Sequence, residues 1–390
     1  MTTQPVSLPA EDIFRVVRDI FVDELSRSRR TTFSAADGAE WTPETPVRES
    51  GIGLDSLERF TIAARLNETF HLYRSGVEDN LLRAATLGDT VEVIQAGRAE
   101  FGSHISFYSG GTTGTPHIVS HAVADLMSEV QELTELFPGC RRVVVTVPVH
   151  HIYGFIFGVL LPRALAVPAV DAQYAFLSGN RLPQTGDLVV SIPFTWQRLV
   201  ASISRWGDGV MGASSTAALS EETASAVCRA GVRRLIEVYG SSETAGVGWR
   251  DRCAETPHFT LFRRWTRAGE GSLRSGSRTV DLPDRLTWHD DRRFLPSGRR
   301  DSVVQVGGTN VDLDSLREKI LELVPEATDC AVRLGPEDRI RAFLVGPENS
   351  LDEREISARL AEHLSAAALP RSIMIGAQLP RSTAGKVVDW

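Results

Sequence analysis

The spacing of apolar residues changes near residue 97 of this chain. Before that point apolar positions recur every three or four residues, which predicts amphipathic helices at residues 11–28, 51–72, 77–86 and 87–97. The two longer stripes consist of Ile13, Val16, Val17, Ile20, Phe21 and Leu25, and of Leu57, Phe60, Ile62, Ala63, Leu66 and Phe70. No strand-like segment lies between these helices. We therefore predict an all-α, four-helix domain over residues 1–97.

From His104 onward, short apolar runs alternate with amphipathic helices. Runs such as RVVVTVP and DLVVSIP are each followed by a helical pattern, which predicts a largely parallel sheet covered on both faces. Around residues 255–297 short strands rich in Arg, Gly and Thr predict a small β subdomain. We place an α/β core at residues 98–298 and a small α+β domain at residues 299–390.

The composition is typical of a globular protein, with 42% hydrophobic and 24% charged residues. No apolar run approaches the length that spans a bilayer, and the first residues lack the pattern of a signal peptide. Cys140, Cys228, Cys253 and Cys330 are scattered, so we expect neither a disulfide framework nor a zinc site, and we expect a cytoplasmic protein. The net charge of -8 argues against nucleic acid as a partner.

The stretch SFYSGGTTGTPH combines a strand with a loop rich in glycine and threonine. Glycines allow close approach of the backbone to a phosphate, and hydroxyls add hydrogen-bond donors. No Gly-Lys-Ser/Thr follows, so this is not a Walker A loop. An ordinary turn explains such a stretch equally well when it is taken alone.

Three further stretches follow apolar strands: PVHHIYGF, SSTAAL and VYGSSETAG. Loops at the carboxyl ends of parallel strands are where open α/β sheets bind ligands. Glu243 in the third stretch is suited to bind Mg²⁺ through a hard carboxylate oxygen. Each stretch alone is also explained by a helix cap or a surface glutamate.

In this order and spacing, these stretches and the terminal LPRSTAGK resemble the adenylate-forming (AMP-dependent synthetase/ligase) superfamily. That superfamily includes acyl-CoA synthetases, aryl acid ligases and nonribosomal peptide adenylation domains. The resemblance covers about residues 104–390 and implies ATP, Mg²⁺ and an acid as substrates.

The resemblance also implies a role for each matching residue. The implied phosphate-binding residues are Ser109, Gly110, Gly111, Thr112, Thr113 and Gly114. Those implied for adenine and ribose are Ser215, Thr216, Ala217, Tyr239, Gly240, Asp284 and Arg299. His151, Tyr153 and Gly154 would line the acyl pocket, Asp301 would be the interdomain hinge, and Gly307 and Gly308 would line the thiol channel. Glu243 would hold Mg²⁺.

Lys386 would be the catalytic residue, and it is one of only two lysines in 390 residues, the other being Lys319. A compact ammonium on a flexible stem can bridge a carboxylate and a phosphate while charge moves between them. In the family the terminal domain swivels, so that this lysine arrives for adenylation and leaves before the thiol attacks.

The segment Gly53-Leu54-Asp55-Ser56-Leu57-Glu58, with LGDTVEVI about thirty residues later, resembles an acyl carrier protein. By that resemblance Ser56 would carry a 4′-phosphopantetheine arm, whose phosphate the helix N-terminus would favour. The implied partners are a phosphopantetheinyl transferase and downstream enzymes of polyketide or fatty-acid type. Simple capping of a helix is the alternative explanation of the Asp55–Leu57 triplet.

Several positions depart from the superfamily pattern. His117 and Gln305 stand where lysines are usual, and Gly110 replaces a hydroxyl residue. The long α/β region that usually precedes the phosphate loop is replaced by the carrier-like segment. The segment HHIYGFIFGVLL has no acid to pair an α-ammonium, which favours a non-amino acid, either aryl or fatty. His151 and Tyr153 could bind a phenolic hydroxyl, which favours aryl acids.

Three functions remain open on the sequence. The first is transfer of the activated acyl group to a phosphopantetheine thiol on the chain's own Ser56. The second keeps the chemistry but uses free CoA or a separate carrier. The third is a carrier or scaffold protein whose ligase half is inactive.

Overall fold

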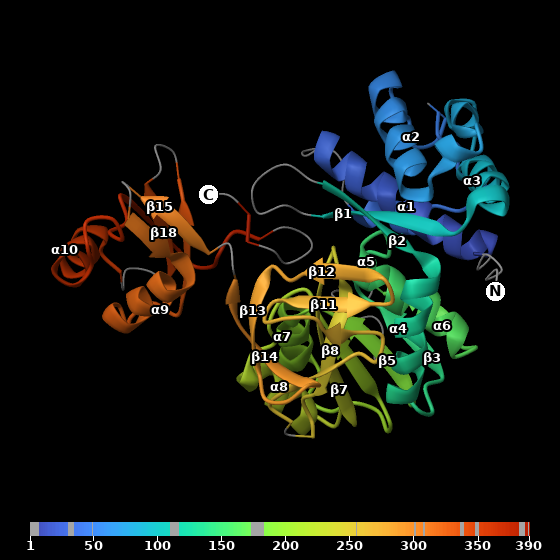
Figure 1. Cartoon of the computed structure of the whole chain (residues 1–390). Helices are drawn as coiled ribbons and strands as arrows, with labels where there is room; N and C mark the ends of the chain where they lie inside the picture. The colour runs from blue at the N-terminus through green and yellow to red at the C-terminus, as the bar shows by residue number, and fades with distance from the viewer. Residues whose placement is uncertain are drawn as a thin grey trace. The chain divides into compact units, whose positions relative to one another are not determined.

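The computed structural model describes residues 8–29, 35–48, 50–109, 117–172, 183–254, 256–299, 302–306, 309–335, 339–347, 351–381, 387, 388 and 390. The chain forms two compact units, Met1–Arg264 and Trp265–Trp390. The domain boundaries that we placed after residues 97 and 298 differ from this division and stay predictions. Figure 1 shows the elements of both units along the chain.

The first unit begins with the predicted helices. They are α1 (Ala10–Ser28), α2 (Ser56–Phe70) and α3 (Leu87–Phe101), with 3₁₀ helices at Ala35–Glu40, Leu72–Arg74 and Glu78–Leu82. The apolar stripe of α1 is buried, as its spacing predicts. The predicted helix at 77–86 is present only as the short 3₁₀ helix. The described part of this region therefore holds three α-helices, where we predicted four.

Helix α1 is fastened to the α/β part of the same unit by charged groups. Arg15 and Arg18 both bind the carboxylate of Asp171, Arg18 at 2.6 Å. The carboxylate of Asp19 accepts the main-chain N–H of Val149 at 2.7 Å. These are charge-assisted bonds in partly or fully buried places, which makes them strong and directional. The helical region is thus bonded directly to the α/β part and belongs to the same compact unit.

A two-stranded antiparallel hairpin follows, formed by β1 (His104–Ser109) and β2 (His117–Ala122). Helix α2 ends at its base, where Nε2 of His71 lies 2.9 Å from the hydroxyl of Ser106. The predicted phosphate loop joins these two strands in the sequence. The helical region therefore supports the strands on either side of that loop.

The main sheet of the first unit has the strand order β9-β8-β7-β6-β5-β3-β4. Its strands are β3 (Arg142–Val145), β4 (Ala169–Asp171), β5 (Asp187–Ser191), β6 (Met211–Ser214), β7 (Arg234–Ser241), β8 (Ala245–Asp251) and β9 (Phe259–Leu261). Strands β3 to β7 are parallel, and β8 and β9 are antiparallel. β3, β5 and β6 are almost wholly buried, as apolar runs such as LVV predict, whereas the edge strand β4 is only partly buried.

Helices cover this sheet (Figure 1). They are α4 (Val123–Leu136), α5 (Ile152–Phe155), the π-helical turn Ile156–Leu160, α6 (Leu161–Ala164), α7 (Pro193–Ser202) and α8 (Glu221–Arg229). Trp196 and Leu199 of α7 and Val227 of α8 pack with Val189 and Leu235 of the strands in one apolar core. The alternation of strand and helix thus produces the predicted α/β core.

The second unit is built from short strands followed by an α+β part. Its elements are β10 (Thr266–Arg267), β11 (Ser272–Ser275), β12 (Arg278–Asp281), β13 (Asp284–Trp288), β14 (Arg293–Arg299), β15 (Val303–Val306), β16 (Thr309–Asp312), α9 (Leu313–Leu323), β17 (Asp329–Leu334), β18 (Ile340–Val345), α10 (Glu353–His363) and β19 (Ser372–Gly376). β10 to β12 form an antiparallel sheet, and β17, β18 and β19 form another with one parallel pair.

The structure contains a disulfide that we did not expect from the sequence. Cys228 of α8 and Cys253, which follows β8, are bonded with their Cα atoms 5.5 Å apart. Their separation of 25 residues gives no sign of this, because the fold brings the two elements together. Cys140 and Cys330 are free. In the described part of the chain, no helix has the length and apolar character needed to cross a membrane.

Candidate active site

The parallel strands of the first unit end along one edge of the sheet, and three of the predicted motifs follow them. His151 and Tyr153 come after β3, Ser215 and Thr216 after β6, and Glu243 after β7. Because parallel strands have their carboxyl ends at the same edge, the fold gathers these loops there. The topology thus places these three motifs at the same edge of the sheet.

The residues predicted for the acyl pocket lie at the start of α5. His151 is partly buried and its ring centroid lies 4.1 Å from that of His150. His150 is buried, and this burial lowers its pKa well below the ordinary value, so it is neutral. A Cβ on Gly154 would lie 2.0 Å from the carbonyl oxygen of Pro148, so only glycine fits there.

We expected that Tyr153 could bind a phenolic hydroxyl of the substrate, but in the structure its hydroxyl makes a contact within the protein. Its own hydroxyl is buried and donates to the main-chain oxygen of Ser191 at 3.1 Å. Burial raises the pKa of Tyr153 well above its ordinary value, so the phenol keeps its proton. Its donor is therefore engaged in joining α5 to the end of β5.

The predicted adenine turn leaves β6 at Ser215. The hydroxyl of Ser215 is buried and donates to the main-chain oxygen of Val238 in β7 at 2.9 Å. Thr216 has a φ of 78°, a left-handed conformation that is costly for a threonine. Thr216 and Ala217 are exposed, as residues that meet a ligand must be.

The motif after β7 forms a tight turn into β8. A Cβ on Gly240 would lie 2.1 Å from the carbonyl oxygen of Ala245, which explains the glycine. The hydroxyls of Ser241 and Thr244 lie 3.0 Å apart and close the turn. Glu243 lies in this turn and is partly exposed. The ring centroid of Tyr239 lies 5.8 Å from that of Phe259.

The donors around Glu243 can be tested against a magnesium ion. No group of three or more His, Cys, Asp or Glu side chains that could hold a metal exists within the described residues. Mg²⁺ is commonly held by one or two protein carboxylates together with substrate phosphates. A single accessible carboxylate in a turn therefore fits an ion that arrives with ATP.

The residues predicted for ribose lie in the second unit. Asp284 is the first residue of β13 and is paired in register with Arg299, the last residue of β14. The pairing of these two positions across adjacent strands is consistent with one shared role. Asp284 is partly buried.

Several predicted residues lie outside those that the structure describes. They are Gly110, Gly111, Thr112, Thr113, Gly114, Asp301, Gly307, Gly308 and Lys386. Ser109 is the last residue of β1, and only its backbone is described. The roles of these residues stay predictions.

Ser56 is the exposed first residue of α2. The cap of this helix is Asp55, whose carboxylate accepts the N–H of Glu58 at 2.8 Å, while Glu58 accepts the N–H of Asp55 at 3.1 Å. This capping box satisfies the helix end without Ser56. The Ser56 hydroxyl is thus in a position to be modified, but its setting is also that of an ordinary helix start.

Residues 104–269 match the model of a family described as AMP-binding enzyme. A 4-coumarate–CoA ligase of Halorhodospira halophila is 34% identical over 392 residues, which cover 97% of this chain and 99% of that ligase. The chain belongs to the adenylate-forming, AMP-binding enzymes. A second 4-coumarate–CoA ligase, from Cereibacter sphaeroides, is 36% identical over 354 residues, covering 88% of this chain and 85% of the relative. The AMP-binding enzyme described here is an AMP-forming acid–thiol ligase.

Solved structures of other AMP-binding enzymes share its fold. ATP-bound MatB from Rhodopseudomonas palustris aligns with a TM-score of 0.60 at 14% identity, covering 96% of this chain and 91% of MatB. O-succinylbenzoate Coenzyme A synthetase (MenE) from Bacillus subtilis in complex with AMP aligns with a TM-score of 0.54 at 15% identity, covering 80% of this chain and 72% of MenE.

Sequence reasoning missed some residues that hold this AMP-binding enzyme's site. His121 on β2 is buried, and its Nε2 lies 2.7 Å from the main-chain oxygen of Ser242, next to Glu243. Glu237 is buried in the middle of β7. Glu237 did leave a signal, because a carboxylate inside the apolar run LIEVYG must find a partner when it is buried.

Proposed function

We propose that this ligase activates an aryl carboxylic acid of the 4-coumarate type with ATP and transfers the acyl group to the thiol of CoA. The observation that supports this most is the similarity to 4-coumarate–CoA ligases over nearly the whole of both chains. The aligned length includes the helical region. That region is therefore shared with enzymes named for CoA as acceptor.

The chemistry of the acyl motif agrees with such an acid. The segment His150–Leu161 contains no carboxylate, and Phe155, Ile156, Phe157 and Val159 within it are buried. An ammonium beside these side chains would be left unpaired at a high desolvation cost. A planar aromatic acid without an amino group meets no such penalty.

The reaction has two balanced steps. A carboxylate oxygen of the acid attacks the α-phosphorus of ATP, and pyrophosphate leaves to give the acyl adenylate. The thiol sulfur then attacks the acyl carbonyl carbon, AMP leaves, and the thiol proton is released. We assign the phosphate contacts to the loop 109–114, the Mg²⁺ ligand to Glu243, and the bridging cation to Lys386.

The exposed turn at Thr216 and Ala217 and the ring of Tyr239 would hold the adenine. Asp284 and Arg299 would hold the ribose hydroxyls. Gly307 and Gly308 would border the path of the thiol, and Asp301 would be the pivot between the two steps.

Transfer to phosphopantetheine on Ser56 is the second candidate. It is favoured by the exposed Ser56 and by two exposed apolar neighbours, Leu57 at 74% and Phe60 at 64% exposure, which a carrier partner could contact. The buried bonds of Arg18 and Asp19 count against it, because a carrier must move to deliver its thiol. CoA therefore remains the proposed acceptor.

The test is a pyrophosphate-exchange assay with 4-coumarate, benzoate, a medium-chain fatty acid and phenylalanine, followed by mass analysis. We expect exchange to be fastest with 4-coumarate and 4-coumaroyl-CoA to form when CoA is added. Lys386→Ala should reduce exchange about a hundredfold or more, since an electrostatic contact made only in the transition state is lost.

Ser56→Ala separates the two acceptors. The variant should form the CoA thioester at the rate of the unchanged enzyme. Acyl transfer to the protein itself, seen as a mass increase after treatment with a phosphopantetheinyl transferase and lost in Ser56→Ala, would instead establish the carrier function. Absence of exchange with every acid would leave the scaffold function.

A further inference from the structure

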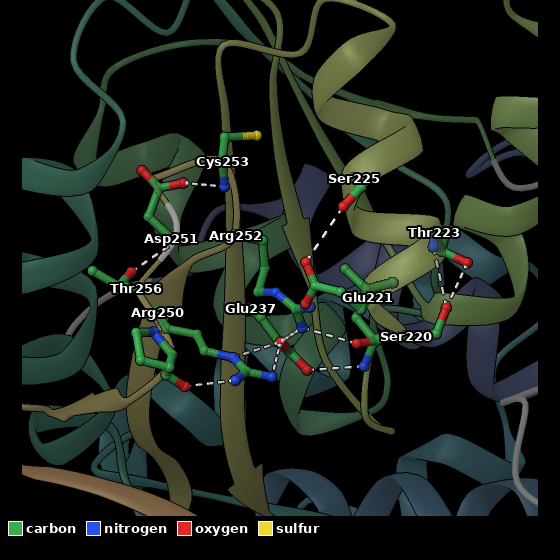
Figure 2. A network of polar contacts seen from close by, with 12 residues as sticks. Ser220, Glu221, Thr223, Ser225, Glu237, Arg250, Asp251, Arg252, Cys253 and Thr256 are labelled. Atoms are coloured by element: carbon green, nitrogen blue, oxygen red, sulfur yellow. Dashed lines mark hydrogen bonds and ion pairs between the residues drawn. The ribbon is translucent and has the colours of Figure 1, made fainter. Parts of the chain in front are cut away.

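Glu237, Arg250, Arg252 and Glu221 form a cluster of charged side chains between β7, the end of β8 and the start of α8 (Figure 2). At its centre is Glu237 of β7, with 2% of its surface exposed. One carboxylate oxygen accepts the main-chain N–H of Leu219 at 2.8 Å. The other accepts from Arg250 at 2.9 Å and from Arg252 at 2.6 Å. Arg250 lies in β8 and Arg252 directly follows its last residue, so the cluster joins β7 and the end of β8 to the turn.

Arg252 holds the same residue of the turn from its other side. Its Nη1 atom donates to the main-chain oxygen of Leu219 at 2.8 Å, in addition to Glu237. The N–H and the carbonyl of Leu219 are thus both bound by one ion pair. Nη2 of Arg252 also binds Glu221 in the first turn of α8 at 2.5 Å. The end of the turn and the start of α8 are fixed together.

The turn needs such restraint because its backbone is unfavourable. Thr216 has a φ of 78°, and a non-glycine residue keeps such a conformation only when its surroundings hold it there. The hydroxyl of Ser215 fixes the first end of the turn to Val238. Glu237 and Arg252 fix the second end.

The cluster also reaches the other predicted adenine contact. The guanidinium of Arg250 lies 4.4 Å from the ring centroid of Phe259. The ring of Phe259 in turn lies 5.8 Å from that of Tyr239. The turn is therefore bonded to Arg252, and Tyr239 is linked to Arg250 through the ring of Phe259.

A buried ion pair is a poor way to gain stability, because apolar side chains of the same volume often stabilise a core as well or better. This ion pair instead fixes the orientation of the turn. Glu237 accepts the N–H of Leu219, and Arg252 donates to its carbonyl oxygen. We propose that Glu237 and Arg252 are positioning residues for adenine, which hold Ser215–Leu219 in the conformation that binds and selects the nucleotide. This inference rests on the proposed function.

The test compares Arg252→Met with Arg252→Lys and Glu237→Gln. In the pyrophosphate-exchange assay, Arg252→Met should raise KM for ATP about tenfold and reduce the preference for ATP over GTP about as much, because Leu219 loses a buried partner. KM for the acid should stay within about twofold, since we assign the acid to the separate motif around His151. Arg252→Lys should recover part of both effects.

Arg142→Met is the matched control. Arg142 binds Asp187 with two bonds, of 3.0 and 2.6 Å, but this pair lies at the starts of β3 and β5, at the opposite ends of the strands from the turn. We expect the control to unfold at lower temperature while its KM for ATP and its ATP preference stay unchanged. Equal shifts in the control would show a general loss of stability and would overturn the proposal.

Two further outcomes decide the matter. If Arg252→Met does not fold, the folded Arg252→Lys and Glu237→Gln variants must still show a raised KM for ATP and a lower ATP preference; unchanged values overturn the proposal. If the unchanged enzyme shows no exchange with any acid, the proposed function fails. Calorimetry of AMP binding then still tests whether Glu237 and Arg252 position the adenine turn. We expect Arg252→Met to bind AMP about tenfold more weakly. An affinity equal to that of the unchanged protein would contradict the proposal.

Discussion

Nε2 of His121 donates a hydrogen bond of 2.7 Å to the main-chain oxygen of Ser242. His121 lies on β2, the strand that returns from the predicted phosphate loop. Ser242 immediately precedes Glu243, the proposed ligand of Mg²⁺. The strand that follows the predicted phosphate loop is thus bonded to the residue before the proposed Mg²⁺ ligand.

This bond predicts a defined effect of His121→Phe. Phenylalanine fills the space but leaves the Ser242 oxygen without its donor, so the turn that carries Glu243 can shift. We expect kcat/KM for ATP to fall about tenfold and the Mg²⁺ concentration for half-maximal exchange to rise. Ile118→Val on the same strand is the control, since Ile118 is exposed. An unchanged Mg²⁺ dependence of His121→Phe would contradict the link.

Asp19 makes the stability of the first unit depend on pH. Burial raises its pKa from 3.8 to about 6. The folded state therefore binds the proton of Asp19 more tightly than the unfolded state does. The contribution of this proton to the free energy of unfolding is complete below the pKa of the unfolded state and is lost as pH rises through about 6. Relative to Asp19→Asn, the free energy of unfolding of the unchanged protein should fall by about 2 kcal/mol between about pH 4 and pH 7.

Urea unfolding of both proteins at several pH values measures this difference. Asp79→Asn serves as the control, because Asp79 is exposed. A difference between the unchanged protein and Asp19→Asn that is the same at every pH would be inconsistent with a raised pKa.

The Cys228–Cys253 bond predicts the thiol count of the protein. Denatured without reductant, the oxidised chain should titrate only Cys140 and Cys330, and reduction should release the other two thiols. Replacing both bonded cysteines by alanine should lower the free energy of unfolding by about 3 kcal/mol, because the closed loop restricts the unfolded chain. Four thiols without reductant would show that the bond does not form.

Trp390 predicts an effect on only one of the two reaction steps. The guanidinium of Arg333 lies 3.7 Å from its ring centroid, and Phe343 packs on it edge-on at 5.8 Å. Arg381 and Val387 are bridged, so these contacts hold one end of the segment that contains Lys386. Trp390→Ala should slow acyl-adenylate formation about tenfold, because a cation–π anchor of this kind is lost.

Transfer from pre-formed acyl adenylate to CoA should change much less in Trp390→Ala. Trp390→Phe keeps an aromatic face for Arg333 and should restore most of the first step. Equal losses in both steps would mean that Trp390 supports the second unit in general and not the lysine segment.

The elements of the fold were largely predictable, because each depends on local periodicity. The stripe of α1 and the apolar run of β5 bury the residues that their spacing indicates. The gathering of the predicted motifs at one edge of the sheet was also predictable, because parallel strands have their carboxyl ends at the same edge. Residues 77–86 were harder, because a short amphipathic pattern does not distinguish an α-helix from the 3₁₀ turn found at Glu78–Leu82.

Contacts between distant residues were not predictable. The spacing of Cys228 and Cys253 says nothing about their meeting, and the partner of the Tyr153 hydroxyl lies 38 residues away in β5. Glu237 was detectable as a charge in an apolar strand, but its partners Arg250 and Arg252 depend on how β7 and β8 pair in the fold. These contacts follow from the tertiary fold, and a single sequence carries no direct record of it.

The anchoring of α1 has a consequence for how the chain matures during translation. Arg15 emerges from the ribosome long before Asp171, its partner 156 positions later in the chain. Helices α2 and α3 can pack on α1 before then, but the charged groups that hold α1 to the sheet still lack their partner. Contacts so distant in sequence slow folding. Attachment of the helical region to the sheet is therefore a late step in the folding of the nascent chain.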